Sequence, residues 1–104
     1  MDEKIDAAIR IVQQRLPALT VHADMQKVSQ AALNLAQAKA LYSTLVKPTG
    51  EMDDELAFLL GRIRSSIGAT ELQHVTQSVL NMMHAKMQWM ATAGQPEGKR
   101  PKTN

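Results

Sequence analysis

The sequence contains no cysteine and only three aromatic residues, which are Tyr42, Phe58 and Trp89. Without cysteine the chain forms neither disulfides nor thiolate metal sites, which fits a reducing compartment. With so few aromatic rings, a core must be built from aliphatic side chains and from the seven methionines, which fill irregular gaps easily. A length of 104 residues is enough for one domain with a modest core.

Long apolar runs are also missing. No run approaches the roughly 20 residues that a membrane-spanning helix needs. The first residues, Met1-Asp2-Glu3-Lys4, lead directly into an amphipathic segment without the apolar stretch of a signal peptide. We therefore expect a cytoplasmic protein with no membrane partner.

The excess of positive charge is confined to the end of the chain. Residues 1–94 carry nine Lys or Arg and nine Asp or Glu, so the formal net charge of +2 arises in residues 95–104. There Lys99, Arg100 and Lys102 outnumber Glu97. A nucleic-acid-binding domain normally carries its basic face on the folded body. The neutral body therefore argues against nucleic acid as a partner.

Apolar residues recur with helical periodicity in four segments, which predicts helices over residues 2–16, 24–46, 53–67 and 70–93. Pro17 ends the first helix, and a Lys-Pro-Thr-Gly turn signal at residues 47–50 separates the second from the third. The predicted fold class is all-α, a small bundle of about four helices with the long second and fourth helices as an antiparallel frame.

Residues 1–94 are expected to form a single helical domain. Residues 95–104 are polar and interrupted by Pro and Gly, so we expect them to form a disordered basic tail. Two helix starts are predicted from capping residues. Asp24 is the expected N-cap of the second helix, and Thr70 and Gln73 form a capping box for the fourth.

No catalytic, cofactor-binding or metal-binding constellation is found. The three histidines are dispersed, and Glu71 with His74 gives only one Glu-x-x-His pair, whereas a carboxylate-bridged dimetal site needs two. There is no glycine-rich phosphate loop and no nucleophile motif. A cluster of acidic residues is interpreted as favourable charge at a helix start, and it comprises Glu51, Asp53, Asp54 and Glu55. We therefore expect no enzyme activity, no cofactor and no metal ligand.

The fourth predicted helix carries an apolar arc about 180° wide, which is broader than the stripe that a surface helix usually buries. The centre of the arc is formed by Val79, Met83 and Met90. Met82 and Trp89 lie on one flank and Met87 lies toward the other, so we interpret part of the arc as an interface with another protein. The alternative is a helix buried on several sides, with Met82 and Trp89 packed against the first helix.

The third predicted helix also has an apolar side chain outside its core stripe. Phe58 lies about 160° around the helix from Leu56, near Gly61 and Ser65, which leave a shallow strip for close helix packing. The predicted protein-binding residues are therefore Phe58, Met82, Met87 and Trp89.

The segment Met83-His84-Ala85-Lys86-Met87 resembles the Met-His-Ala-Gln-Met stretch near the end of TraM-type quorum-sensing antiactivators. Gly94 and Pro96, which follow the helix, are similar to the Gly/Pro/Lys ending of that family. The resemblance is limited to the C-terminal helix and its end. It implies a helical, dimerising protein that sequesters a LuxR-type transcription factor by protein contact.

We therefore predict a non-enzymatic regulatory protein that binds another protein, with a transcription factor as the expected partner and a homodimer as a further expectation. The alternative is a small DNA-binding regulator, because the third and fourth helices resemble a helix-turn-helix in outline. Two details disagree with that alternative. Arg64 stands where the motif has a small residue, and the fourth helix has no Lys or Arg before Lys86 to anchor a phosphate.

Overall fold

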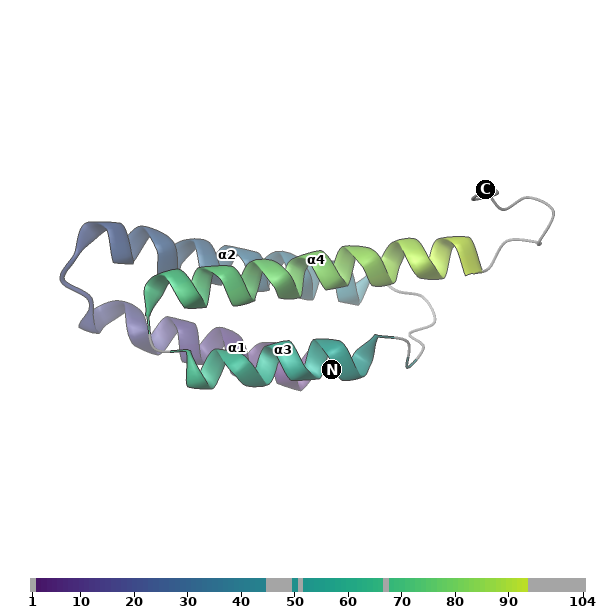
Figure 1. Cartoon of the computed structure of the whole chain (residues 1–104), viewed down its shortest axis with the longest axis horizontal. Helices are drawn as coiled ribbons and strands as arrows, with labels where there is room; N and C mark the ends of the chain where they lie inside the picture. The colour runs from purple at the N-terminus through teal and green to yellow at the C-terminus, as the bar shows by residue number, and fades with distance from the viewer. Residues whose placement is uncertain (1, 45–49, 51, 67, 94–104) are drawn as a thin grey trace.

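The computed structural model describes residues 2–44, 50, 52–66 and 68–93. These residues form four α-helices, with a short 3-10 turn, η1, at Leu16–Ala18. The α-helices are α1 at Asp2–Arg15, α2 at His22–Ser43, α3 at Asp53–Ser65 and α4 at Ala69–Ala93 (Figure 1). No β-strand occurs in the described part of the chain. The predicted all-α class with four helices is confirmed, whereas the predicted tail at residues 95–104 lies outside the described residues.

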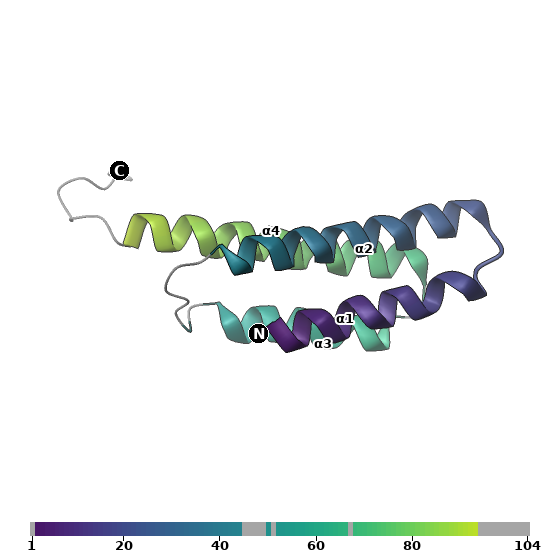
Figure 2. The same ribbon diagram turned by 180° about the vertical axis from the view of Figure 1, so that it is seen from behind.

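The helices form two antiparallel hairpins, each made of a short helix followed by a long one (Figures 1 and 2). In the first hairpin, Lys39 of α2 forms a salt bridge with Asp6 of α1 at 2.5 Å. In the second, Lys86 of α4 pairs with Asp53, the first residue of α3. Both pairs join the open ends of their hairpins, because α1 ends and α2 begins, and α3 ends and α4 begins, at the opposite end (Figure 1).

The two hairpins pack side by side in the same orientation, so the long helices α2 and α4 are parallel neighbours. Lys27 Nζ donates to Thr70 Oγ1 at 2.7 Å near the start of both helices, and Asn34 Nδ2 donates to Thr76 Oγ1 at 3.3 Å two turns later. The prediction that these helices form the frame is confirmed, but the predicted antiparallel direction is wrong. Short turns make a helix antiparallel to its successor in sequence, whereas α2 and α4 belong to different hairpins.

The order of the helices around the bundle also determines which helices α4 contacts. Among the described residues, α4 contacts α2 and α3, and α1 contacts the same two helices but not α4. Met82 and Trp89 therefore do not pack against the first helix, which was the alternative interpretation of their apolar character.

Two predicted caps differ from the observed helix starts. The amide of Met25 donates to Val21 O at 3.0 Å, so α2 begins before Asp24 and that carboxylate lies within its first turn. The amide of Leu72 donates to Gly68 O at 3.0 Å, so α4 begins before Thr70 and the threonine hydroxyl binds Lys27 instead. The first accepting carbonyls, of Val21 and Gly68, thus lie three and two residues before the predicted caps. The helices α2 and α3 end at Ser43 and Ser65, earlier than the predicted residues 46 and 67, and Ser66 already has an extended backbone.

The core lies between the two hairpins and is aliphatic, as the scarcity of aromatic residues predicts. Fully buried side chains come from all four helices, and they include Ile5, Val12, Val28, Leu35, Leu56, Ile63, Leu72, Val79 and Met83. The predicted core positions Val79 and Met83 are confirmed, whereas Met90 is only half-buried. One polar pair, Asn34 and Thr76, is buried where α2 meets α4.

Arg15 fastens the end of α1 to the end of α3. Its guanidinium donates to the carbonyl oxygens of Ser66 at 2.5 Å, Arg64 at 3.0 Å and Ile63 at 3.2 Å. The last carbonyls of a helix have no partner within the helix, and a cation there is also favoured by the helix dipole.

Replacing Arg15 with methionine is expected to lower the free energy of unfolding by about 1–2 kcal/mol, because three carbonyl groups lose a charged donor while the aliphatic part of the side chain is retained. Urea denaturation followed by circular dichroism measures the change. Arg10→Met, on the exposed face of the same helix, is the control and should stay within about 0.5 kcal/mol of the parent chain. Equal effects of the two substitutions would contradict a capping role for Arg15.

Candidate protein-binding surface

An apolar groove runs between α3 and α4 on the surface of the second hairpin. We call it the α3/α4 groove, and its lining residues are Asp54, Glu55, Phe58, Leu59 and Met82. Leu59 and Met82 are half-buried and pack against the core with part of their surface. The groove thus brings together two of the four predicted protein-binding residues, Phe58 and Met82, from different helices.

Phe58 is the most exposed large apolar side chain among the described residues, with 67% of its surface accessible. Its neighbours in sequence explain the exposure. Leu56, Leu60 and Ile63 face the core and are buried, and Phe58 lies on another side of α3. The ring is therefore held at the surface by the packing of the helix that carries it.

Trp89 extends the same apolar surface along α4. It lies seven residues after Met82, so it is about 10 Å further along the helix and about 20° around it. Because Lys86 pairs with Asp53, the first residue of α3, Trp89 lies past the start of that helix. The indole is 46% exposed.

Met87 does not belong to this surface. It lies about 140° around α4 from Met82 and within about 20° of Thr76, whose hydroxyl binds Asn34 of α2. Met87 is half-buried on that side of the helix. The predicted set therefore divides into a surface of Phe58, Met82 and Trp89, and a separate position for Met87.

A buried lysine lies next to the surface of Phe58, Met82 and Trp89, and it was not among the predicted functional residues. The side chain of Lys86 is 0% exposed, its ammonium pairs with the Asp53 carboxylate, and it lies 5.7 Å from the centre of the Tyr42 ring. Lys86 is seven residues after Val79, which places it about 20° from the centre of the apolar arc. A lysine near the centre of an apolar arc, together with an acidic helix start elsewhere in the chain, could have indicated this buried ion pair.

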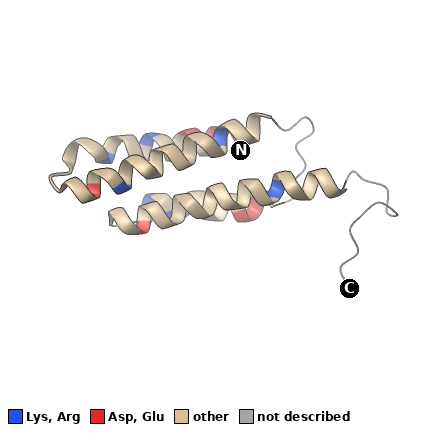
Figure 3. Ribbon diagram, turned by 90° about the horizontal axis from the view of Figure 1, so that it is seen from above, with Lys and Arg blue, Asp and Glu red and all other residues tan. Residues whose placement is uncertain are grey.

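The edge of the α3/α4 groove is acidic, because Asp54 and Glu55 lie in the first turn of α3 beside Phe58. Elsewhere on the helices the charges are mixed. Figure 3 shows acidic and basic residues interspersed along both hairpins in the view from above, with no gathering of Lys and Arg on one side. The surface around Phe58 is thus apolar at its centre and negative at one edge.

Other arrangements that the sequence raised are not formed by the described residues. No group of three or more His, Cys, Asp or Glu in that part of the chain is placed to hold a metal ion. The contact between Asp53 and Lys86 holds α3 alongside α4 over the whole length of α3. A helix-turn-helix instead crosses its helices at about 90–120°, so the α3–α4 hairpin has a different geometry.

None of the described helices is both long and apolar enough to span a membrane. No protein-family model, curated protein or solved structure matches the chain.

Proposed function

We propose that this chain is a non-enzymatic regulatory protein that binds another protein across the α3/α4 groove and Trp89. The observation that carries the proposal is the placement of the aromatic residues. The chain has three. Phe58 is exposed in the α3/α4 groove, and Trp89 is exposed about 20° around α4 from Met82, which lines the same groove. Aromatic side chains supply much of the binding energy in protein interfaces, and an exposed pair that flanks an apolar groove suits that role.

The chemistry of the groove favours a partner with a complementary surface. Phe58, Leu59 and Met82 offer apolar area, and methionine adapts to irregular partner surfaces. Asp54 and Glu55 at the edge favour Lys or Arg on the partner, which would accelerate association and align the two proteins. The resemblance of residues 83–87 to antiactivators suggests a transcription factor as the partner, and a second copy of the chain is the other candidate.

The double substitution Phe58→Ala and Trp89→Ala tests the proposal. Because Phe58 is 67% exposed and Trp89 46% exposed, we expect the variant to fold with a loss of about 1–2 kcal/mol. We expect its affinity for the partner to fall by about 30-fold or more, which corresponds to the loss of at least 2 kcal/mol typical of an interface hot spot. Capture from an extract of the native host, analysed by mass spectrometry, and sedimentation for self-association give the readouts.

Val21→Ala with Leu33→Ala is the matched control, because these side chains are 54% and 50% exposed on the first hairpin. The control should capture the same proteins as the parent chain. The proposal is wrong if both double variants retain all captured partners and the same oligomeric state. Trp89 is the only tryptophan, so a blue shift of its fluorescence upon binding would place the partner on this surface directly.

A further inference from the structure

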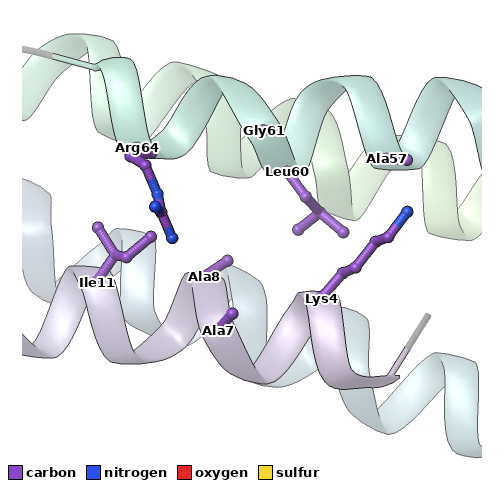
Figure 4. A pocket seen from close by; sticks show the side chains of 8 residues that line it. All are labelled: Lys4, Ala7, Ala8, Ile11, Ala57, Leu60, Gly61 and Arg64. Atoms are coloured by element: carbon purple, nitrogen blue, oxygen red, sulfur yellow. The ribbon is translucent and has the colours of Figure 1, made fainter.

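A second groove lies on the other side of α3, between α3 and α1 (Figure 4). We call it the α1/α3 groove. Small or aliphatic side chains form most of its lining, and a basic side chain stands at each end; the residues are Lys4, Ala7, Ala8, Ile11, Ala57, Leu60, Gly61 and Arg64. None of these residues belongs to the α3/α4 groove, so the two surfaces are separate.

The middle of the α1/α3 groove is lined by Ala7, Ala8 and Gly61, with the side chain of Leu60 beside them (Figure 4). Ala7 and Ala8 project from α1 toward Gly61 of α3, and a methyl group built on Gly61 would meet no atom within 4 Å. The distance at which two helices pack is set by the side chains between them. A third helix could therefore approach the backbones of α1 and α3 closely along this line.

The two basic side chains come from opposite helices and point across the groove (Figure 4). Lys4 reaches from α1 toward the α3 side, and Arg64 reaches from α3 toward the α1 side, near Ile11. Among the described residues, neither side chain has an ion-pair partner. Arg64 lies near Ile11, which is seven residues after Lys4, so the two basic residues stand about two helical turns of α1 apart along the groove (Figure 4).

The like charge of the two ends argues against a second copy as the occupant. In a two-fold symmetric pair the same surface faces itself. If the grooves of two copies faced each other, each basic end would meet a basic end of the other copy, whether the two grooves ran parallel or antiparallel. Like charges across an interface are destabilising. The groove fits a different partner, with negative charge at two points.

We propose that the α1/α3 groove binds an amphipathic helix of another protein that carries two carboxylates seven residues apart. The carboxylates pair with Lys4 and Arg64, and the small or apolar residues between them pack against Ala7, Ala8 and Gly61. Seven residues of the bound helix span about 10 Å, as do Lys4 and Ile11 along α1. This surface is independent of the α3/α4 groove, so the protein would hold two partner segments along the two sides of α3.

A synthetic helical peptide tests this proposal. The probe is an Ala/Leu-rich peptide of about 18 residues, long enough to be helical in water, with two Glu residues seven positions apart and a fluorescent label. The comparison peptide has Gln at the same two positions. Fluorescence anisotropy at low ionic strength should show saturable binding of the Glu peptide that is at least about tenfold tighter than that of the Gln peptide, because the charge pairs are weakly screened there.

Three variants of the full chain locate the binding. Lys4→Gln with Arg64→Gln should lower the affinity for the Glu peptide by about tenfold or more. Arg10→Gln with Arg62→Gln, on exposed positions of the same helices, should change that affinity little. Gly61→Leu should block the groove without a change in charge, and it should fold because the space around Gly61 is open and leucine favours helix. Circular dichroism checks the fold of each variant.

Three results would overturn the proposal: no saturable binding of the Glu peptide, equal binding of both peptides, or binding that Gly61→Leu and Lys4→Gln with Arg64→Gln leave unchanged. Loss of binding in the Phe58→Ala and Trp89→Ala variant would also overturn it, because that result would place the peptide in the α3/α4 groove. If only the proposed function of the α3/α4 groove is wrong, the peptide affinities of all these variants should still be as expected.

Discussion

Asp53→Ala is expected to lower the free energy of unfolding by about 3 kcal/mol, measured by urea denaturation at neutral pH. Its carboxylate pairs with the ammonium of Lys86, whose side chain is 0% exposed. When a buried ion pair loses one partner, the remaining charge stays in a poorly solvated site, which typically costs about 3–5 kcal/mol. The Asp53 side chain is 33% exposed, so water can reach part of the site and the effect should lie at the lower end of that range.

Asp54→Ala is the matched control for this prediction. Asp53 and Asp54 both lie in the first turn of α3, so both interact with its helix dipole, but only Asp53 has a salt bridge to Lys86. The control should lose less than about 1 kcal/mol. In a double-mutant cycle, Lys86→Met should remove most of the cost of Asp53→Ala, because no buried charge is then left. The prediction is contradicted if Asp53→Ala lowers the free energy of unfolding equally in the parent chain and in the Lys86→Met variant.

Met83→Ala is expected to destabilise the bundle by about 3 kcal/mol. Met83 is fully buried in α4, and the cluster around it draws on all four helices. Truncation of a buried Met, Leu or Ile to Ala typically costs about 2–5 kcal/mol, because apolar contact is lost and a cavity remains. Thermal and urea denaturation of the purified variant measure the loss.

Met90→Ala provides the comparison, because Met90 lies seven residues further along the same helix and is only half-buried. Its truncation should cost about 1 kcal/mol. The rank order is the decisive result. A Met90→Ala variant that is less stable than Met83→Ala would mean that the packing of α4 is tightest beyond the start of α3, which disagrees with the observed burial.

The four helices were predictable from the sequence because each has its own apolar period. Residues such as Ile5 and Val12 in α1, or Leu56 and Ile63 in α3, face the core at the positions that periodicity predicts. The relative direction of the long helices was not predictable in this way. Periodicity identifies the face that a helix buries, but it contains no information on which other helix covers that face.

The buried pair of Lys86 and Asp53 was missed for a related reason. Lysine is rarely fully buried without a partner, and the partner here is 33 residues away in sequence. Conversely, the exposure of Phe58 was predicted correctly, because it depends only on the angle of that residue around its own helix. Which face of a helix a residue occupies was predictable, whereas the starts of α2 and α4 and the contacts between helices were not.

The last two turns of α4 have a thermodynamic consequence for any partner that reaches Trp89. Tyr42, near the end of α2, and Asp53, at the start of α3, both lie beside Lys86, so the turns after Lys86 project past the described ends of both neighbours (Figure 1). A helix end with fewer neighbouring helices opens locally at a lower free energy than the rest of the fold, and its amides exchange with solvent earlier. A partner that closes over Trp89 must keep this end helical, and the conformational entropy that is lost reduces the net affinity gained from the indole contact.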